Sequence, residues 1–333
     1  MGNSSVTIYQ VAQAAGVSIS TVSLALNHPD RVSSATRDRI IGIAGELGYR
    51  PGATASERAR RRVGRIAVLA PFSSYETYRT RLIGILDTFG PDDVEVVVLD
   101  APSAAETSTP LLETLPVRGD IDGLLIMGVP LGEQGADRLR RWGPPTVLVD
   151  TAHSTFSTVT FDDEQAGYTV AAHLLDRGHR RLAYLHEPQR SGGFVSAGML
   201  RRDGILRALR AAQDAEYDEF TLPVNHFDAA REFAAEFTRS PDHPTAVIAH
   251  HDVLAAGFLS GLRAAGVAVP GTVAVAGFDD GPLAAGLGLT TIRQQFADSG
   301  RRAAELLRSM IQTGQHTPTR TLLLPELIVR ETT

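Results

Sequence analysis

The chain has 333 residues, of which 43% are hydrophobic and 21% are charged, as in an ordinary globular protein of about two domains. It contains no cysteine, which excludes disulfides, thiolate catalysis, iron–sulfur clusters and cysteine-based zinc sites. The longest apolar runs are far shorter than the ~20 residues of a membrane span, and the first residues lack a secretory pattern. We therefore expect a cytoplasmic protein that does not enter a membrane.

The formal net charge of −6 conceals a basic N-terminal segment. Residues 1–62 contain eight arginines and four acidic residues, whereas acidic residues outnumber arginines in the rest of the chain. The chain has 32 arginines and no lysine. A basic segment on an acidic body predicts a polyanionic partner for that segment, although chance clustering in a linker would give the same excess.

The first 50 residues have the pattern of three short helices. Thr7 and Ser18 are suitable N-caps, and Ser33 or Ser34 can cap a third helix. Gly16 follows the first apolar stretch, where a left-handed residue commonly ends a helix, and Ser18 comes only two residues later. The apolar positions expected to pack together are Ile8, Val11, Ala12, Ala15, Val22, Ala25, Leu26, Ile40, Ile43, Ala44 and Leu47. A helix, a tight glycine turn and a second helix form the helix-turn-helix layout.

The second helix keeps short side chains for its outer face. They are Ile19, Ser20, Thr21, Ser23, Leu24 and Asn27. Such groups suit base edges and thymine methyls in a major groove, whereas an acidic face would indicate simple solvation. Helix-turn-helix pairs also occur as plain structural units, so DNA binding and a structural role are both open at this point.

Three stretches carry a resemblance to a known family: residues 7–18 (TIYQVAQAAGVS), 20–23 (STVS) and 47–51 (LGYRP). They resemble, without a gap, the DNA-binding head of the lactose-repressor (LacI/GalR) family of transcription regulators. The resemblance implies that Ile19, Ser20 and Leu24 face base edges. It also implies that phosphates are bound or positioned by Thr7, Tyr9, Ser18, Ser23, Asn27, Ser33, Thr36 and Tyr49. Many members have arginine where Leu24 stands, so a different base is expected there, because arginine reads guanine bidentately.

Residues 53–62 (ATASERARRR) form a basic stretch after the head. The family counterpart is a hinge helix that orders on operator DNA, which implies that Ala55 and Arg58 face the DNA. Arg58 stands where the family has a leucine wedge. A guanidinium does not unstack bases as leucine does, but it can lie in a narrow A·T-rich minor groove. A solvated linker with an incidental basic run is the alternative.

From Gly64 onward, short apolar runs alternate with amphipathic stretches. The runs expected to be buried parallel strands are residues 66–70, 94–99, 123–127, 146–149, 182–185, 246–249 and 273–276. The stretches expected to be helices include residues 78–89, 166–175, 201–212, 229–237 and 254–264. Strand–helix alternation over this length predicts an α/β fold with two doubly wound sheets.

Several of the expected strands end in polar side chains. Asp150, Asp162, His251 and Asp279 each follow an apolar run, and His251 lies within the triplet His250-His251-Asp252. Ligands of doubly wound sheets bind beyond the carboxyl ends of the strands. A single aspartate there is commonly a helix cap, but a set drawn from both halves of the chain suits a neutral polyol such as a sugar.

The resemblance continues through this region, at residues 162–167 (DDEQAG), 173–182 (HLLDRGHRRL) and 275–280 (VAGFDD). It implies the two-lobed fold of periplasmic sugar-binding proteins. The implied effector-binding positions are Tyr78, Asp150, Asp162, Arg201, Phe227, His251 and Asp279. Arg201 would clamp the ligand, Asp279 would accept from its hydroxyls and Phe227 would stack on it. His251 stands where the family usually has asparagine, which predicts a ligand that differs from the family's better-known sugars. For Tyr78, a surface role is an alternative.

An enzyme is not expected, because the chain lacks G-x-S-x-G, H-E-x-x-H, G-x-x-x-x-G-K-[ST] and a G-x-G-x-x-G after a strand. Neither a cofactor nor a metal is expected, since adjacent histidines such as His250 and His251 seldom face one ion. We expect a transcription regulator that acts as a repressor. It is expected to bind near-palindromic operator DNA as a homodimer, under the control of a small-molecule effector. The alternative is a sugar-binding receptor without DNA function, which would need export.

The resulting division of the chain has three parts. The expected boundaries are a helix-turn-helix head at 1–51, a hinge at 52–63 and a bilobal effector-binding and dimerisation domain at 64–333. Within the last, lobe 1 is expected at about 64–161 and 293–320, and lobe 2 at about 162–292 and 321–333. No leucine heptad follows the strand-like residues 322–329, so a tetramer is not expected.

Overall fold

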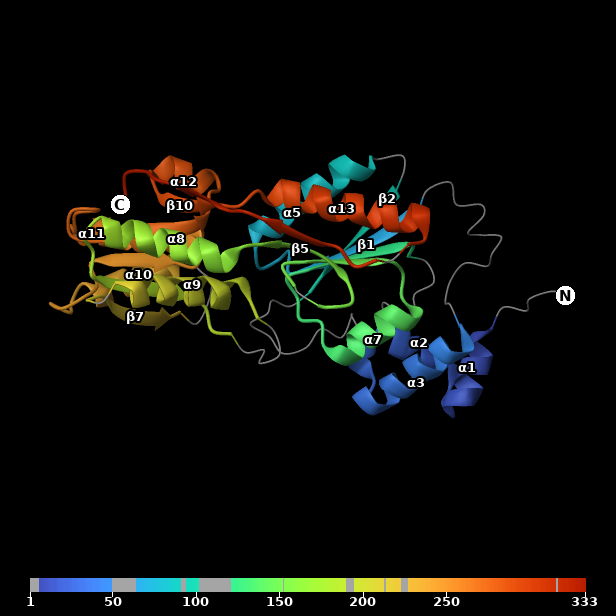
Figure 1. Cartoon of the computed structure of the whole chain (residues 1–333). Helices are drawn as coiled ribbons and strands as arrows, with labels where there is room; N and C mark the ends of the chain where they lie inside the picture. Colours follow the sequence, from blue (N-terminus) through green and yellow to red (C-terminus); the bar gives the residue numbers. More distant parts are fainter. Residues whose placement is uncertain are drawn as a thin grey trace. The chain divides into compact units, whose positions relative to one another are not determined.

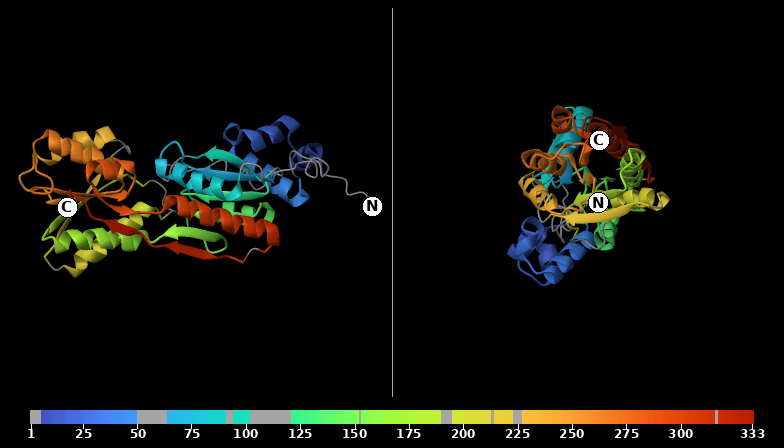
Figure 2. Two further views of the ribbon diagram at one scale, coloured as in Figure 1. Left: turned by 90° about the horizontal axis from the view of Figure 1, so that it is seen from above. Right: turned by 90° about the vertical axis from the view of Figure 1, so that its left-hand side faces the viewer.

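The computed structural model describes residues 6–49, 64–90, 94–101, 121–151, 153–189, 195–212, 214–222, 227–315 and 317–333. The chain divides into two compact units. Unit 1 comprises Met1–Val159 and Phe296–Thr321, and unit 2 comprises Thr160–Gln295 and Leu322–Thr333. Each unit therefore takes segments from separate parts of the chain, and the last segment, red in Figure 2, contributes to both. No helix among the described residues is long and apolar enough to cross a membrane.

The N-terminal part of unit 1 is a helical head (Figure 1, blue). It consists of α1 (Ile8–Ala15), α2 (Ile19–Asn27), a short 3-10 turn (Pro29–Arg31) and α3 (Ser34–Leu47). Gly16 ends α1 at φ 61°, the left-handed conformation predicted for it. The Ser18 hydroxyl accepts the backbone N–H of Thr21 at 3.1 Å, and the Ser33 hydroxyl accepts that of Thr36 at 3.4 Å. Ser33, not Ser34, is therefore the cap of α3.

The core of the head agrees with the predicted apolar faces except at the end of α3. Ile41 is fully buried there, whereas Leu47 is 40% exposed, so the prediction for Leu47 was wrong. The reason is the left-handed Gly48, which turns the chain back so that the N–H of Tyr49 donates to the carbonyl of Ala44 at 2.8 Å. Tyr49 then packs against the core in place of Leu47.

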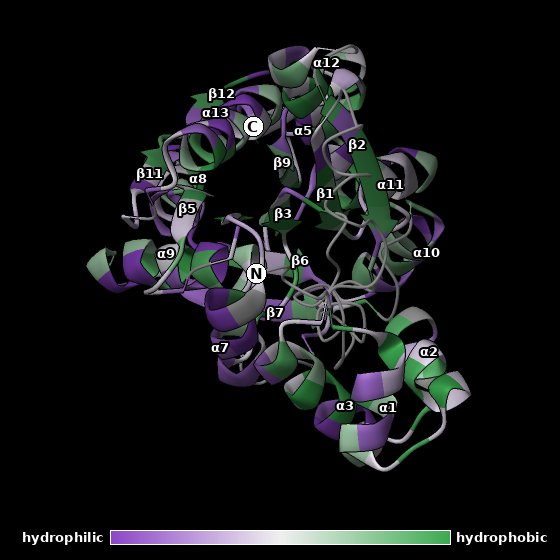
Figure 3. Ribbon diagram, turned by 90° about the vertical axis from the view of Figure 1, so that its right-hand side faces the viewer, coloured by the Kyte–Doolittle hydropathy of each residue, from purple (hydrophilic) through white to green (hydrophobic). Residues whose placement is uncertain are grey.

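The rest of unit 1 is a six-stranded sheet with strand order β11-β5-β4-β3-β1-β2. The strands are β1 (Gly64–Ala70), β2 (Val94–Asp100), β3 (Gly123–Met127), β4 (Thr146–Val149), β5 (Ser157–Phe161) and β11 (Arg320–Leu323). The pairs from β2 through β5 are parallel. Helices α5 (Glu76–Phe89), α7 (Glu133–Trp142) and α13 (Phe296–Thr313) belong to this unit. In Figure 3 most of the α7 ribbon has the colour of hydrophilic residues, and most of the β2 ribbon has the colour of hydrophobic ones.

Unit 2 has a sheet of the same design, with strand order β12-β10-β9-β8-β6-β7. The strands are β6 (Arg181–His186), β7 (Glu216–Thr221), β8 (Ala246–Ala249), β9 (Ala274–Asp279), β10 (Thr290–Arg293) and β12 (Glu326–Ile328). Only the β10–β12 pair is antiparallel among the described pairs of this sheet. Its helices are α8 (Asp163–Asp176), α9 (Ala197–Ala211), α10 (Phe227–Phe237), α11 (Asp252–Ala264) and α12 (Pro282–Leu287). The two sheets confirm the predicted doubly wound α/β class.

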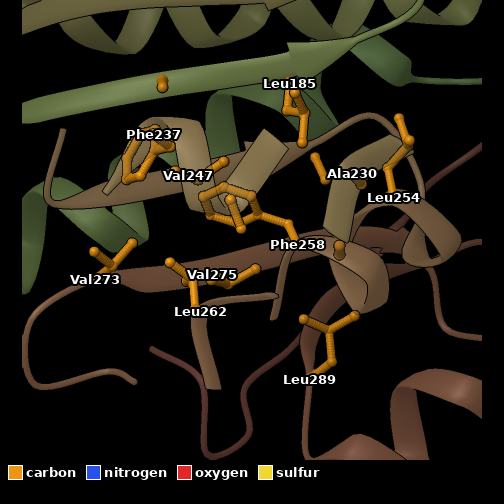
Figure 4. Close-up of a cluster of buried hydrophobic side chains, with 14 of the residues drawn as sticks. Leu185, Ala230, Phe237, Val247, Leu254, Phe258, Leu262, Val273, Val275 and Leu289 are labelled. Carbon is orange, nitrogen blue, oxygen red and sulfur yellow. The ribbon is translucent and has the colours of Figure 1, made fainter. Parts of the chain in front are cut away.

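Figure 4 shows the core between the sheet of unit 2 and helices α10 and α11. Phe258 of α11 is fully buried and lies edge-on to Phe237 of α10, with ring centroids 5.1 Å apart. Val247 and Val275 from adjacent strands β8 and β9 belong to the same cluster. This packing fixes the first turn of α11 over the sheet, and His251 lies at the start of that helix.

Glycines set the distance between two further pairs of helices. A Cβ on Gly204 of α9 would lie 1.9 Å from the carbonyl oxygen of Glu164 on α8. In unit 1, a Cβ on Gly84 of α5 would lie 1.9 Å from the carbonyl oxygen of Ala297 on α13. The backbones therefore touch at both crossings, which brings the side chains that flank them close together.

Candidate functional site

The second helix of the head presents an open outer face. Val22, Ala25 and Leu26 are buried on its inner side, whereas Ser20 is exposed and Ile19 is 39% exposed. Ser23 and Leu24 are half-buried. The helix begins at Ser18, whose hydroxyl also lies 2.8 Å from that of Thr21. An apolar side chain and small hydroxyls thus face outward from a rigidly packed helix, which is an arrangement that can enter a groove of a duplex.

Hydroxyl-bearing residues also mark the starts of the other two helices. Tyr9 is 69% exposed in the first turn of α1, and the N–H of Thr7 donates to Gln10 Oε1 at 2.8 Å. At α3, the Ser33 hydroxyl donates to that of Thr36 at 2.9 Å. Helix N-termini carry N–H groups and a positive dipole end, which are the features that bind phosphate oxygens.

Four other predicted DNA contacts differ from these: one is partly buried, and the side chains of three lie outside the described part of the structure. Burial raises the pKa of Tyr49, which packs against the head core. The side chain of Asn27 lies outside the described part of the structure, as do Ala55 and Arg58. One role was not predicted at all: Arg37 Nη1 donates to the carbonyl of Pro29 at 3.2 Å and so braces the turn between α2 and α3.

Arg201 is the centre of a buried polar network in unit 2. Its guanidinium donates to Asp163 Oδ1 at 2.9 Å, to the carbonyl of His250 at 2.6 Å and to Gln294 Oε1 at 2.9 Å. Gln294 Nε2 in turn donates to Asp163 Oδ1 at 3.0 Å. The guanidinium also lies 4.4 Å from the ring centroid of Phe278. Although burial opposes its charge, Asp163 and Asp279 raise the pKa of Arg201.

The two successive aspartates at the start of α8 have different hydrogen-bond partners. Asp162 caps the helix, because its Oδ1 accepts the N–H of Gln165 at 3.0 Å. Asp163 is 5% exposed and bonds Arg201. The sequence-based assignment of Asp162 to the effector site remains a prediction, and the roles of Asp163 and Gln294 were not foreseen.

The three residues that follow β8 by one to three positions, His250, His251 and Asp252, have different partners. His251 Nδ1 accepts the N–H of Leu254 at 3.3 Å, so His251 is the cap of α11, and its Nε2 lies 3.2 Å from Glu187 Oε1. His250 Nδ1 lies 3.0 Å from the hydroxyl of Tyr184, and burial lowers the pKa of His250 well below its usual range. No group of three or more potential metal ligands exists among the described residues.

The third member of that triplet, Asp252, ties three segments together. Its carboxylate accepts the Thr291 hydroxyl at 2.6 Å and the N–H of Gly281 at 3.1 Å. Burial raises the pKa of Asp252 to about 7. Asp279, at the end of β9, has φ 114°, a left-handed value that non-glycine residues rarely adopt. The structure therefore holds the backbone of Asp279 in a strained turn beside the Arg201 network.

Phe227 begins α10 and is half-buried. A Cβ on Gly257 of α11 would lie 2.2 Å from the carbonyl oxygen of Phe227, so its backbone is fixed against α11. The stacking role predicted for its ring remains a prediction.

In unit 1, Asp150 follows β4 with φ 53° and forms a buried ion pair with Arg81 of α5. The Arg81 guanidinium lies 4.3 Å from the ring centroid of Phe296 and 4.9 Å from that of Tyr78. The Tyr78 hydroxyl packs on Gly128, where a Cβ would lie 1.7 Å from it. Tyr78 is therefore held beside the end of β3, and Arg81 is a partner of Asp150 that sequence reasoning missed.

Polar groups thus line the carboxyl ends of both sheets, and an outward-facing recognition-type helix lies in the head. These features define a class of protein, a helix-turn-helix DNA-binding regulator with ligand-binding α/β units. Residues 7–52 match the family described as bacterial regulatory proteins of the lacI family, and residues 171–333 match the periplasmic binding protein-like domain.

Individual relatives agree over nearly the whole chain. The HTH-type transcriptional repressor CytR of Escherichia coli (strain K12) is 31% identical over 98% of this chain and 96% of its own length. The structure of the transcriptional regulator CelR in complex with cellobiose is 28% identical, with a TM-score of 0.69, covering 98% of this chain and 100% of that one. The lac repressor dimer bound to operator and the anti-inducer ONPF shares the fold, with 24% identity, a TM-score of 0.70 and coverage of 99% of both chains.

The chain therefore belongs to the lacI family of bacterial regulatory proteins. As a member of that family it is a helix-turn-helix transcription regulator rather than an enzyme, which confirms the function predicted from the sequence.

Proposed function

We propose that this protein represses transcription by binding a near-palindromic operator as a homodimer, and that a small-molecule effector, a sugar or a related metabolite, controls this binding. The observation that carries the proposal is the outer face of α2, where exposed Ser20 and Ile19 project from a helix whose other side is buried in the head core. A repressor is supported by the similarity to the transcriptional repressor CytR, and a sugar-like effector by the cellobiose in the CelR structure. Operator binding requires access to the chromosome, so the working location is the cytoplasm.

On the DNA side, Ile19, Ser20 and Leu24 read base edges in the major groove. The remaining predicted head residues, Thr7, Tyr9, Ser18, Ser23, Asn27, Ser33, Thr36 and Tyr49, bind or position phosphates. Leu24 offers only apolar contact, so it favours a thymine methyl over guanine at its position. Ala55 and Arg58 complete the operator contact from the hinge at residues 52–63 by lying against the minor groove.

On the ligand side, Asp279 and Arg201 bind effector hydroxyls from unit 2, with Asp162, Phe227 and His251 beside them. Arg201 has five N–H groups, and Asp163, Gln294 and the His250 carbonyl hold it rigidly through three of them. Such bracing is the preorganisation that a binding site needs. In unit 1, Gly128 and Arg81 fix Tyr78 and Asp150, and both residues stay predicted effector contacts of that unit.

A second copy of the chain covers the outer face of α5. Ile83 and Leu86 on that helix are 56% and 47% exposed, whereas Ile85 is fully buried. Paired exposed aliphatics one turn apart favour association, and a two-fold symmetric operator requires two heads. We therefore place part of the dimer contact on α5.

The experiment is fluorescence anisotropy with full-length protein and operator duplexes selected from genomic fragments. Specific binding to a two-fold symmetric duplex, weakening steeply between about 50 and 200 mM salt, is the expected result, because phosphate contacts release counterions. Effector should change that affinity by about 5–150-fold. Equal affinity for selected and scrambled duplexes would overturn the proposal.

A further inference from the structure

The strand order of unit 2 contains a reversal. β6 lies in the sheet between β7 on one side and β8 on the other, and all three strands are parallel. The chain therefore leaves β6 in one direction to form β7 and returns to its other side to form β8. The carboxyl ends of the strands at such a reversal diverge, and ligands of doubly wound sheets bind there.

Two side chains meet at this reversal. Glu187 directly follows β6, and His251 follows β8 by two residues. Their side chains are 11% and 8% exposed, and His251 Nε2 lies 3.2 Å from Glu187 Oε1. The pair therefore spans the two strand ends between which the topology places a ligand.

The helix cap at His251 decides which atom of the pair donates. Because His251 Nδ1 accepts the N–H of Leu254, the ring hydrogen lies on Nε2 and is donated to Glu187. The imidazole is itself fixed by α11, so it holds the Glu187 carboxylate in one place. A fixed carboxylate accepts hydrogen bonds from ligand hydroxyl or N–H groups and repels a phosphate or carboxylate.

The guanidinium nearby does not reverse this preference. Arg201 is bonded to Asp163 and also interacts with Asp279, so two carboxylates already share its charge. It orients ligand oxygens without supplying the unmatched positive charge that an anionic ligand requires.

We propose that Glu187, held by His251, is a specificity-determining residue that selects an uncharged ligand rich in hydroxyl groups and rejects its phosphorylated counterpart. This inference rests on the proposed function and deepens it, because it assigns the effector site a charge preference. It adds Glu187 to the site residues and distinguishes neutral sugars and nucleosides from their phosphates.

The test uses full-length protein and matched probes: ribose and ribose 5-phosphate, glucose and glucose 6-phosphate, adenosine and adenosine 5′-phosphate. Melting temperature identifies binders, and calorimetry gives their Kd values. At least one uncharged probe should bind at least tenfold more tightly than its phosphate. Equal or tighter binding of the phosphates, or no binding by any uncharged probe, would overturn the inference.

Variants assign the preference to the residue. Glu187→Gln keeps an acceptor for His251 but removes the charge. The Kd of the phosphate divided by the Kd of its uncharged counterpart should therefore fall at least tenfold. Glu219→Gln is the matched control, because Glu219 pairs with His186 and Arg202 on the β7 side. An unchanged ratio in Glu187→Gln contradicts the inference, and the wild-type ratio decides it alone if that variant fails to fold. Operator binding without ligand tests the proposed function separately.

Discussion

Arg201 Nε donates to Asp163 Oδ1 at 2.9 Å, and the two side chains are only 7% and 6% exposed. Removing one partner of such a pair leaves the other charge buried and uncompensated, which costs about 3–5 kcal/mol. We expect Asp163→Ala to lower the free energy of unfolding of unit 2 by about that amount in urea denaturation. Asp162→Ala, which removes only a helix cap, should cost about 1 kcal/mol. Equal losses in the two neighbouring variants would show that the pair is not the stabilising element.

The crossing of α8 and α9 depends on Gly204. A Cβ there would lie 1.9 Å from the Glu164 carbonyl and 2.7 Å from the N–H nitrogen of Tyr168, both of which are backbone atoms. Gly204→Ala should therefore destabilise unit 2 by about 1–3 kcal/mol or more and weaken ligand binding, because Arg201 moves with its helix. Gly286→Ala in α12, where no heavy atom lies within 4 Å, is the control and should cost nothing measurable. Thermal unfolding with and without ligand measures both effects.

Asp252 makes the stability of unit 2 depend on pH. Its pKa is about 7 in the folded protein and about 4 when unfolded, so the folded state binds the proton more tightly between these values. Stability from this group is therefore present below about pH 4 and is lost as the pH rises to about 7. The urea concentration at the midpoint of unfolding should therefore decrease less over this pH range in Asp252→Asn than in the wild type. If the midpoint decreases as steeply with pH in the variant as in the wild type, another group causes the pH dependence.

Much of this fold could be predicted because its buried strands are continuous apolar runs. β3, β4 and β8 agree with the predicted residues 123–127, 146–149 and 246–249. β7 was missed because it is an edge strand with a polar sequence, EYDEFT, whose residues are exposed or half-buried. The strand-like stretch 322–329 is in fact divided, since β11 joins one sheet and β12 the other.

The candidate site was only partly readable, for a different reason. Asp163, Arg201 and Gln294 come from distant parts of the chain, and no local pattern reports that they meet. Likewise, the adjacent Asp162 and Asp163 cannot be told apart until the start of α8 sets their directions. Arg81 and Glu187 carried no motif, and only the positions of α5 and β6 reveal them.

The outer face of α2 should control operator choice independently of ligand. Leu24→Arg is expected to make guanine the preferred base at one position of each half-site, because arginine pairs bidentately with guanine. The expected preference over the other bases is about 1–3 kcal/mol of binding free energy. Ser20→Ala should relax selectivity at a neighbouring base. Operator selection and ligand calorimetry on the same preparations check this. Ser309→Ala on α13, an exposed serine outside the head, should leave operator preference unchanged.

Dimerisation through α5 predicts that charge on its outer face separates the subunits. Ile83→Asp combined with Leu86→Asp should raise the dimer dissociation constant at least tenfold in sedimentation experiments, because two carboxylates would be buried at the contact. Leu324→Asp is a control, since Leu324 is 69% exposed outside the helices. A dimer of undiminished stability in the double variant would place the contact elsewhere.

The most direct measurement is the anisotropy titration of a fluorescent two-fold symmetric operator with full-length protein, with and without the uncharged probe that raises its melting temperature. We predict tight binding to that duplex, binding at least 100-fold weaker to a scrambled duplex at about 150 mM salt, and a shift of about 5–150-fold on adding the probe. Operator affinity that is the same for both duplexes, or that no melting-point-raising probe alters, would contradict the account.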